Sequence, residues 1–259
     1  GFWLWELEQF PAALQGAFSR FHEIWTPSRF CLEALSAVSP IPVRRVPLPV
    51  ETPQVGRHGR SHFGLPEEPF IFLFVFDFLS HVERKNPDGV VAAFREAFDD
   101  REDVLLVLKA SHTEFDATAR RRLEQVGEAN NIRWIAEEID RGEVDDLIWL
   151  CDCYVSLHRS EGLGLTLAEA LTLDRPVIAT DYSGSTDLLR SGTGFPVAYE
   201  LVELEHDVGP YESGARWANP NIPQAAELMR WVFEHPEEAA LISRRGGDET
   251  RERYGLESV

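Results

Sequence analysis

A glycine turn between two glutamates is the part of this chain best suited to chemistry. The string HRSEGLGLTLAEAL occupies residues 158–171, directly after a short apolar run, and it opens a predicted helix. Gly162 and Gly164 let the backbone approach a ligand closely. A helix that begins near Gly164 presents unpaired amides and the positive end of its dipole to whatever lies in front of it. The turn therefore predicts a binding site for a diphosphate.

Glu161 precedes the predicted helix, and Glu169 lies on it, eight residues later. Over eight residues of helix the rise is about 12 Å, so the two carboxylates would face different parts of a ligand. Carboxylates are good acceptors for vicinal hydroxyls. A nucleoside diphosphate sugar carries sugar hydroxyls on one side of its diphosphate and ribose hydroxyls on the other, and this pair could hold both. The competing interpretation is an ordinary helix start with two solvated glutamates.

The elements that must position this turn follow a regular alternation from Phe70 onward. Apolar runs typical of buried strands take turns with amphipathic stretches typical of helices. The alternation predicts an α/β fold with a doubly wound, Rossmann-like parallel sheet, which binds ligands at the carboxyl ends of its strands. The predicted strands lie near residues 71–76, 104–109, 132–136, 153–157 and 176–180, and the helices between them include 87–98 and 115–129.

The first 46 residues do not follow this alternation, and we interpret them as the tail of a second α/β domain. They contain helix-like stretches at 13–21 and 29–37. Residues 47–68 are punctuated by proline and glycine, which suits an interdomain linker. The sheet domain is then expected over residues 69–259. After Pro196 the sequence predicts a loop and then a pair of helices over about 223–254.

Charge and hydropathy exclude several classes of partner. The formal charge of -19 repels phosphates and anionic lipid, so a nucleic-acid partner is not expected. The longest apolar run, residues 71–79, is far shorter than the roughly 20 residues that span a bilayer, and Asp77 interrupts it. We read it as a buried strand and expect no integral membrane segment. The chain starts at Gly1, and no signal peptide is visible.

Cysteine and aspartate patterns argue against a structural or catalytic metal. Cys31, Cys151 and Cys153 form an odd and sparse set, which favours a reducing compartment over a disulfide framework. No second Cys or His pair stands near Cys151 and Cys153 at zinc spacing, so buried strand packing is their expected role. The chain contains no D-x-D pair that could hold a divalent ion against a diphosphate.

Taken whole, the string with Glu, seven residues and Glu closely resembles the donor-site signature of family 4 retaining glycosyltransferases. This family belongs to the glycosyl transferases group 1, which have two facing Rossmann-like domains in the arrangement called GT-B. Residues 72–94, FLFVFDFLSHVERKNPDGVVAAF, resemble the first strand, loop and helix of the family's donor-binding domain. A Lys and usually an Arg of that loop contact the diphosphate. Lys85 matches the Lys, Ser80 stands where the Arg is usual, and Arg84 is a candidate to replace it.

Two further segments resemble a subgroup of the same family. The opening GFWLWELEQFP resembles the end of that subgroup's N-terminal, acceptor-side domain, and RWANPNIPQAAELM near the end of the chain resembles its W-A-x-P segment. Trp217 and Pro220 of this second segment are expected to pack rather than to do chemistry. The resemblance thus covers nearly all of the chain, and mainly the C-terminal donor-binding domain.

The resemblance implies transfer of a sugar from a nucleotide-sugar donor to a hydroxyl acceptor, glycan or lipid-linked, with retention and without metal or cofactor. The setting would be glycan or polysaccharide biosynthesis, in the cytoplasm or peripherally at the inner face of the membrane. Glu161 would orient the donor sugar and Glu169 the ribose, while Lys85 and Arg84 would stabilise the charge of the leaving diphosphate. Further substrate contacts are assigned to Gly162, Leu163, Gly164, Leu165 and Thr166 around the phosphates, and to Ser80 and His158.

Several alternatives stay open at this point. A nucleotide-sugar epimerase of the same fold shares the donor crevice, and a donor-binding fragment without turnover would bind but not react. His158 could contact the donor sugar or be a buried hydrogen-bonding residue. The string DYSGSTD, residues 181–187, could line the same crevice, and residues 135–138 stand where the base could bind. The sugar, the base and the acceptor cannot be read from these residues.

Overall fold

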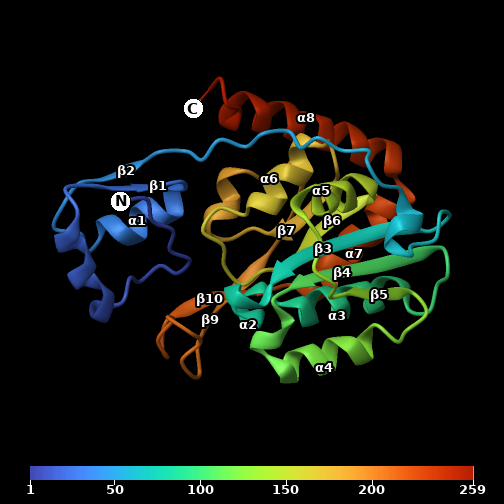
Figure 1. Cartoon of the computed structure of the whole chain (residues 1–259), viewed down its shortest axis with the longest axis horizontal. Helices are drawn as coiled ribbons and strands as arrows, with labels where there is room; N and C mark the ends of the chain where they lie inside the picture. Colours follow the sequence, from blue (N-terminus) through green and yellow to red (C-terminus); the bar gives the residue numbers. More distant parts are fainter. Residues whose placement is uncertain (259) are drawn as a thin grey trace.

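The computed structural model describes residues 1–258 and has a six-stranded parallel sheet at its centre (Figure 1). This confirms the predicted doubly wound fold, and the five predicted strands match β3 to β7 to within two residues at each end. Across the sheet the order is β5, β4, β3, β6, β7, β8. The strands are β3 (Phe70–Asp77), β4 (Val104–Ser111), β5 (Ile132–Ile135), β6 (Cys153–Ser156), β7 (Val177–Thr180) and β8 (Phe195–Val197).

The strand order reverses direction between β3 and β6. From β3 the chain builds outward through β4 and β5, and then returns to place β6 on the other side of β3. In an open α/β sheet the crevice outside the carboxyl ends of two such strands is the usual ligand site. The segments that follow β3 and β6 contain the residues that the sequence singled out, so the fold brings Lys85 and Glu161 to one place.

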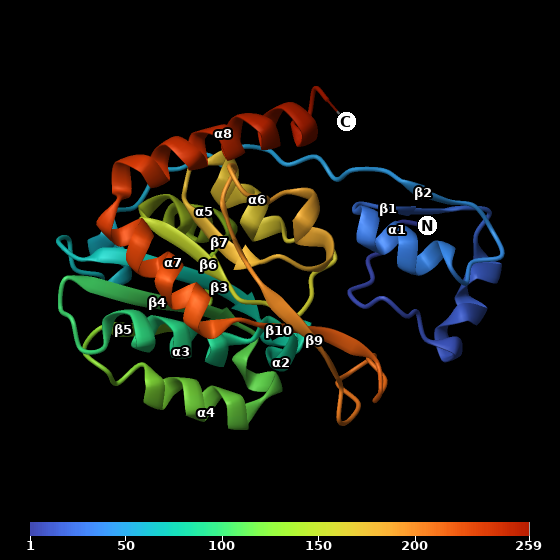
Figure 2. The same cartoon turned by 180° about the vertical axis from the view of Figure 1, so that it is seen from behind.

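Helices cover both faces of the sheet because alternate strand residues point to opposite sides. Phe72, Phe74 and Phe76 of β3 belong to one core, and Ile71 and Leu73 belong to the other. The first face is covered by α3 (Pro87–Phe98), α4 (Ala117–Val126) and α7 (Ile222–Glu234), seen from behind in Figure 2. The second is covered by α5 (Arg141–Leu150), α6 (Leu165–Thr172) and α8 (Pro236–Tyr254).

Residues 1–45 form a small N-terminal lobe to one side of the sheet (Figure 1). It contains a parallel pair of strands, β1 (Ile24–Thr26) and β2 (Val43–Arg45), with η1 (Ala12–Arg20) and α1 (Arg29–Ser36). Residues 46–56 then run in extended form over α8 and α6 before the 3-10 turn η2 (Arg60–Phe63) leads into β3. We keep the predicted division at 1–46, 47–68 and 69–259 as a proposal.

The predicted loop after Pro196 is wrong in one respect. After β8 the chain forms an antiparallel hairpin of β9 (Tyr199–Glu203) and β10 (Arg216–Pro220), which projects from the sheet domain toward the N-terminal lobe. Its Leu204, Tyr211 and Trp217 share a core with Trp5 and Phe10 of the lobe. The hairpin therefore depends on partners some 200 residues away in sequence, which its own acidic, glycine-containing sequence does not reveal.

The stretch predicted as helical at 13–21 is a 3-10 helix rather than an α-helix, whereas the final helical pair is present as α7 and α8. Cys151 and Cys153 are fully buried beside and within β6, as the packing interpretation required. Trp217 and Pro220 are buried too. Within residues 1–258, none of the helices is both long and apolar enough to cross a membrane.

Candidate functional site

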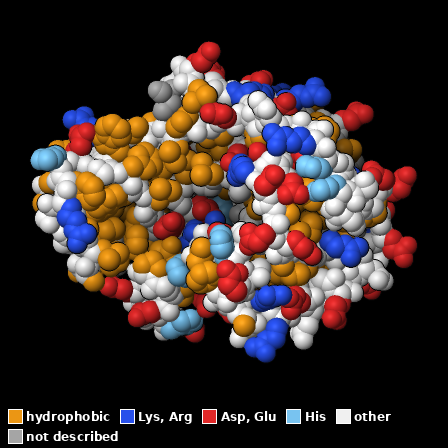
Figure 3. All heavy atoms as spheres, viewed as in Figure 1, with side chains coloured by type: hydrophobic (Ala, Val, Ile, Leu, Met, Phe, Trp, Pro, Cys, Tyr) orange, Lys and Arg blue, Asp and Glu red, His pale blue; other side chains and the backbone are white. Residues whose placement is uncertain are grey.

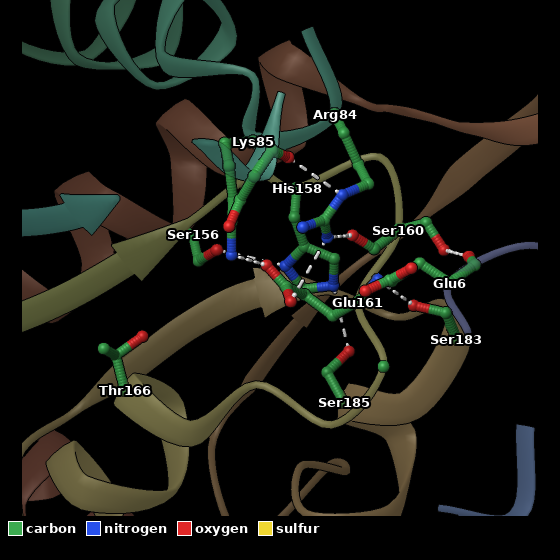
Figure 4. Close-up of polar contacts among 12 residues, drawn as sticks. Glu6, Arg84, Lys85, Ser156, His158, Ser160, Glu161, Thr166, Ser183 and Ser185 are labelled. Carbon is green, nitrogen blue, oxygen red and sulfur yellow. Dashed lines mark hydrogen bonds and ion pairs between the residues drawn. The ribbon is translucent and has the colours of Figure 1, made fainter. Parts of the chain in front are cut away.

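The candidate site lies where three segments meet at the carboxyl ends of β3, β6 and β7 (Figure 4). They are the short helix α2 (Val82–Lys85) after β3, the turn at residues 157–164 after β6, and the 3-10 helix η5 (Ser183–Asp187) after β7. Figure 3 shows charged and histidine side chains gathered between the largely apolar surface of the N-terminal lobe and the main body. Charged side chains thus meet where the N-terminal lobe faces the sheet domain.

Glu161 is held by two cations. Its Oε1 forms an ion pair with Lys85 Nζ, and its Oε2 lies 3.3 Å from Arg84 Nη1. The same Arg84 nitrogen donates to the carbonyl of Ser160 at 2.6 Å. Arg84 is only 3% exposed and Glu161 8%. Adjacent residues need not face the same point, but here both Arg84 and Lys85 converge on one carboxylate.

The protonation states in this cluster follow from burial and pairing. Burial raises the pKa of Glu161, but the charges of Lys85 and Arg84 outweigh it and hold that pKa at about 2. Burial lowers the pKa of Lys85, and the charge of Glu161 opposes the effect. The site therefore contains an ionised carboxylate between two basic side chains, and the charge of Glu6 also acts on both of these side chains.

Asn86 connects the loop that contains Arg84 and Lys85 to the turn after β6, a role that was not predicted from the sequence. Its backbone is left-handed, with φ of 57°, a conformation that Asn tolerates better than most residues. Its side-chain amide donates to the carbonyl of Leu157 at 2.7 Å, and its side-chain oxygen accepts from Gly89 N at 3.2 Å at the start of α3. Arg159 N also donates to the carbonyl of Arg84 at 2.8 Å. The loop after β3 is thus tied directly to the turn after β6.

Only one of the two glycines of the turn, Gly164, has a backbone conformation that favours glycine. Gly164 has φ of +88° and stands immediately before α6, so its conformation favours glycine. Leu163 is buried, whereas Leu165 at the start of the helix is 45% exposed. Tyr154 donates its hydroxyl proton to Thr166 Oγ1 at 2.8 Å. The Tyr154 hydroxyl also lies 3.2 Å from the carbonyl oxygen of Val75, so the side chain of Tyr154 links β3 to the first turn of α6.

Residues 181–187 line the same crevice as the turn. The amide of Glu161 donates to Ser183 Oγ at 2.8 Å, and the amide of Gly184 donates to the carbonyl of Glu161 at 2.9 Å. A Cβ at position 184 would stand 2.0 Å from the carbonyl oxygen of Gly162. Only glycine permits this approach, so η5 packs directly against the backbone of the turn.

Glu169 lies apart from Glu161, as its place on the helix predicted. Its Oε1 is 2.5 Å from Arg141 Nη2 at the start of α5. Burial raises the pKa of Glu169, and Arg141 opposes the rise. Arg141 is a residue that the sequence interpretation missed. Arg141 and Glu169 lie 28 residues apart on successive helices, so no local sequence pattern indicates that they form an ion pair.

His158 and Ser80 take less direct positions. His158 is fully buried, and its ring nitrogens lie 3.0 Å from Ser156 Oγ and 3.0 Å from Ser185 Oγ. Burial lowers the pKa of His158 to about 4, so the ring is neutral at pH 7. Ser80 contributes its carbonyl, which accepts from Arg84 Nε at 3.1 Å. A contact of either residue with substrate stays a prediction.

The N-terminal lobe also reaches the site. Ser160 Oγ donates to the carbonyl of Glu6, and the carboxylate of Glu6 accepts from the Tyr211 hydroxyl at 3.0 Å. Tyr211 comes from the loop of the β9–β10 hairpin. The string WELE around Glu6 was the one available signal for this contact. Taken together, the site offers cations and helix amides for phosphates and separate carboxylates for hydroxyls.

This chain is similar to a known protein family and to a characterised glycosyltransferase. Residues 59–247 match the family described as glycosyl transferases group 1. Over 82 residues the chain is 30% identical to the lipopolysaccharide core biosynthesis mannosyltransferase LpsB of Rhizobium meliloti (strain 1021), a match that covers 32% of this chain and 22% of that protein.

Solved structures share the fold at low sequence identity. A variant of S. aureus TarM, in complex with ligands that include UDP, has a TM-score of 0.68 at 14% identity, over 99% of this chain and 48% of that one. Anabaena HepE in complex with UDP and glucose has a TM-score of 0.70 at 15% identity, over 97% and 67%. Sucrose-phosphate synthase from Thermosynechococcus elongatus has a TM-score of 0.71 at 18% identity, over 95% and 58%.

The chain thus spans about half the length of TarM, at 48%, and its match to LpsB covers 22% of that protein. The family match nevertheless covers most of this chain, including the loop after β3 and the turn with its two glutamates. The chain belongs to the glycosyl transferases group 1 family.

Proposed function

We propose that this chain forms the donor-binding part of a retaining, metal-independent glycosyltransferase that uses a nucleoside diphosphate sugar. The observation that carries the proposal is the convergence of Lys85 and Arg84 on Glu161 at the start of α6. Cations and helix amides together suit a diphosphate, and a carboxylate beside them suits the hydroxyls of the attached sugar. Enzymes that bind only one of these groups do not need both.

Each residue then has a separate task. The carboxylate of Glu161 accepts hydrogen bonds from hydroxyls of the donor sugar, and the carboxylate of Glu169 accepts hydrogen bonds from the ribose hydroxyls. The amides at Gly162 to Thr166 bind phosphate oxygens. Lys85 and Arg84 stabilise the charge that develops on the diphosphate as the glycosidic bond breaks, because fixed cations in a buried site need no reorganisation at that moment.

The proposed reaction is a displacement on one face of the sugar. The bond from the anomeric carbon to the phosphate oxygen breaks, the bond from that carbon to the acceptor oxygen forms, and the acceptor proton passes to the departing phosphate oxygen. The products are a glycoside and a nucleoside diphosphate. No side chain of this chain has to act as the base, which agrees with a Glu161 that is already ionised and paired.

The comparisons support the substrate class at a coarser level. LpsB is named as a mannosyltransferase of lipopolysaccharide core biosynthesis, and the TarM and HepE structures contain UDP. We therefore propose a glycan or lipid-linked hydroxyl as the acceptor. The three unpaired cysteines suit a reducing compartment, so we place the reaction in the cytoplasm or at the inner face of the membrane.

Product analysis tests the proposal. The chain is incubated with UDP-, GDP- and ADP-sugars in EDTA, with simple alkyl glycosides as acceptors, and the products are read by NMR. A new glycosidic linkage with the anomeric configuration of the donor is expected. An isomerised nucleotide sugar would instead show an epimerase, and saturable binding without any product would show a donor-binding module.

A further inference from the structure

Lys109 is a buried charge that the proposed reaction does not use. It stands on β4, two residues before the end of the strand at Ser111, and it is only 3% exposed. Within residues 1–258 its ammonium group donates only to the carbonyl oxygen of Ala110, at 2.6 Å, and forms no ion pair. An ammonium group has three donors, so two remain free. Because lysine is almost never buried without a partner, these two donors call for an acceptor that a ligand could supply.

Lys109 lies at the edge of the sheet where such folds bind ligands. It stands beside Val75 of β3 on one side and Ile135 of β5 on the other, near the carboxyl ends of all three strands. Val75 and Ile135 belong to the core that α5 and α6 cover, so Lys109 between them points to that face as well. The Tyr154 hydroxyl connects Val75 to Thr166 in the first turn of α6. Lys109 therefore lies one strand away from the contact between β3 and the start of α6, where the diphosphate is expected.

A bound nucleotide sugar would extend its base toward Lys109. The donor sugar is assigned to Glu161, whose backbone η5 holds on the side of β7. The nucleoside lies on the other side of the diphosphate from the sugar, and hence toward β4 and β5. Glu169, which is assigned to the ribose, pairs with Arg141 at the start of α5, directly after the loop that follows β5. The base, one unit beyond the ribose, is therefore expected between that loop and the end of β4.

The charges around Lys109 form a pattern that some bases match and others do not. Burial lowers the pKa of Lys109, and the carboxylates of Glu138 and Glu137 in the loop after β5 oppose this effect more than any other charge. A donor flanked by acceptors matches a carbonyl oxygen beside a ring N–H. Uracil has this pair at O4 and N3, and guanine has it at O6 and N1. Cytosine and adenine have an amino group in place of that oxygen, which would set a donor against a donor.

We propose that Lys109 selects the base of the donor by donating a hydrogen bond to O4 of uracil or to O6 of guanine. Glu137 or Glu138 accepts from the ring N–H beside that oxygen. The donor is then a UDP-sugar or a GDP-sugar rather than a CDP-sugar or an ADP-sugar. This assignment rests on the proposed function, because it takes a nucleotide sugar as the ligand. It adds the choice of base, which the phosphate-binding groups and the two carboxylates at Glu161 and Glu169 leave open.

Calorimetry with matched nucleoside diphosphates tests this assignment. UDP is compared with CDP, and IDP with ADP, because each pair exchanges a carbonyl beside a ring N–H for an amino group beside a bare ring nitrogen. GDP is titrated with the purine pair. Lys109→Met removes the donor at similar side-chain length, and Lys109→Gln supplies an amide that can either donate or accept. Arg133→Met is the control, because it removes an exposed positive charge from the neighbouring strand β5. Melting curves are recorded without ligand for every variant.

In each pair that binds, the wild type should bind the carbonyl member at least about tenfold more tightly, the difference expected for one charged hydrogen bond. Lys109→Met should weaken the binding of the carbonyl member by about the same factor and leave the binding of the amino member unchanged. Lys109→Gln should bind the two members nearly equally, and Arg133→Met should keep the wild-type preference. A defect of the fold alone would weaken both members of a pair together, because they share the ribose and the diphosphate.

Three results would overturn the role of Lys109. They are a wild type with no preference for the carbonyl member, a preference that survives in Lys109→Met, and an equal loss of affinity for both members in that variant. The first is read on the wild type alone, so the assignment can fail even where a variant does not fold. Each of the three leaves the proposed function standing, because a diphosphate still binds. If the wild type bound none of these nucleotides, the proposed function itself would fail.

Discussion

Replacing Glu161 with glutamine separates the two things that this carboxylate does. In the ligand-free chain Glu161 neutralises Lys85 and Arg84, and in the proposed complex it accepts hydroxyls of the donor sugar. The glutamine has nearly the same shape and no charge. The variant should therefore lose stability without ligand and lose affinity for nucleotide sugars, but it should keep its affinity for nucleoside diphosphates.

The size of the stability effect follows from the pKa. The pKa of Glu161 lies at about 2 rather than at its ordinary 4.5, and the difference corresponds to on the order of 3 kcal/mol. Breaking a buried ion pair by removing one partner costs about 3 to 5 kcal/mol, because the other partner is left uncompensated. We expect Glu161→Gln to lower the free energy of unfolding at pH 7 by about 3 kcal/mol.

The pH dependence has a definite sign. Because the folded pKa is lowered, the contribution of Glu161 is full above the unfolded pKa of about 4.5 and is lost as the pH falls through about 2. The wild type should therefore lose stability between pH 4.5 and 2, and Glu161→Gln should lose about 3 kcal/mol less over the same interval. Glu249→Gln is the matched control, since it breaks a more exposed pair with Arg190 that is worth about 0 to 1 kcal/mol.

The assays are urea unfolding, with and without a saturating nucleoside diphosphate, and calorimetric titration. Because the variant should keep its affinity for nucleoside diphosphates, the same saturating concentration of diphosphate should stabilise the variant and the wild type by equal amounts. Two results would contradict the role assigned to Glu161. One is a variant as stable as the wild type at pH 7, and the other is a variant whose affinities for nucleoside diphosphate and for nucleotide sugar fall by the same factor.

Three further predictions concern other parts of the site. Lys85→Ala should weaken the binding of a nucleoside diphosphate by about 1.5 to 3 kcal/mol and leave the binding of the bare nucleoside unchanged, as measured by calorimetry. Equal losses of affinity for both ligands would mean that Lys85 does not contact phosphate. Asn86→Ala removes a helix cap and the hydrogen bond to Leu157, so it should lower the free energy of unfolding in urea by about 1 to 3 kcal/mol. It should also weaken the binding of the diphosphate. Unchanged diphosphate binding would mean that the loop after β3 is not part of the binding site. Because burial lowers the folded pKa of His158 to about 4, the unfolded chain binds more protons, so stability should be full above about pH 6.5 and fall toward pH 4. The slope over that interval, measured by urea unfolding, should be smaller in His158→Asn, and an equal slope would contradict the assignment.

The sheet could be predicted from sequence because its signals are local. The run from Phe70 to Asp77 is apolar on both faces, as a central parallel strand must be, and Asn86 with Pro87 marks the start of the next helix. The start of a helix near Gly164 could be predicted for the same reason, and α6 begins at Leu165. Such features need no knowledge of what packs against them.

The parts that could not be predicted depend on distant partners. The β9–β10 hairpin is stabilised by Trp5 and Phe10 of the N-terminal lobe, and its own sequence reads as a polar loop. Arg141 meets Glu169 only because α5 and α6 lie side by side. Whether Arg84 or Lys85 faced the ligand could not be read from adjacent positions, and the fold turns both toward Glu161.

The most direct test of the central claim is a calorimetric titration of UDP, GDP and ADP into the wild-type chain in EDTA. We expect saturable one-site binding of at least one diphosphate without metal, because Lys85, Arg84 and the amides of α6 supply the positive charge. Binding of none of the three, or binding that appears only when magnesium or manganese is added, would contradict it.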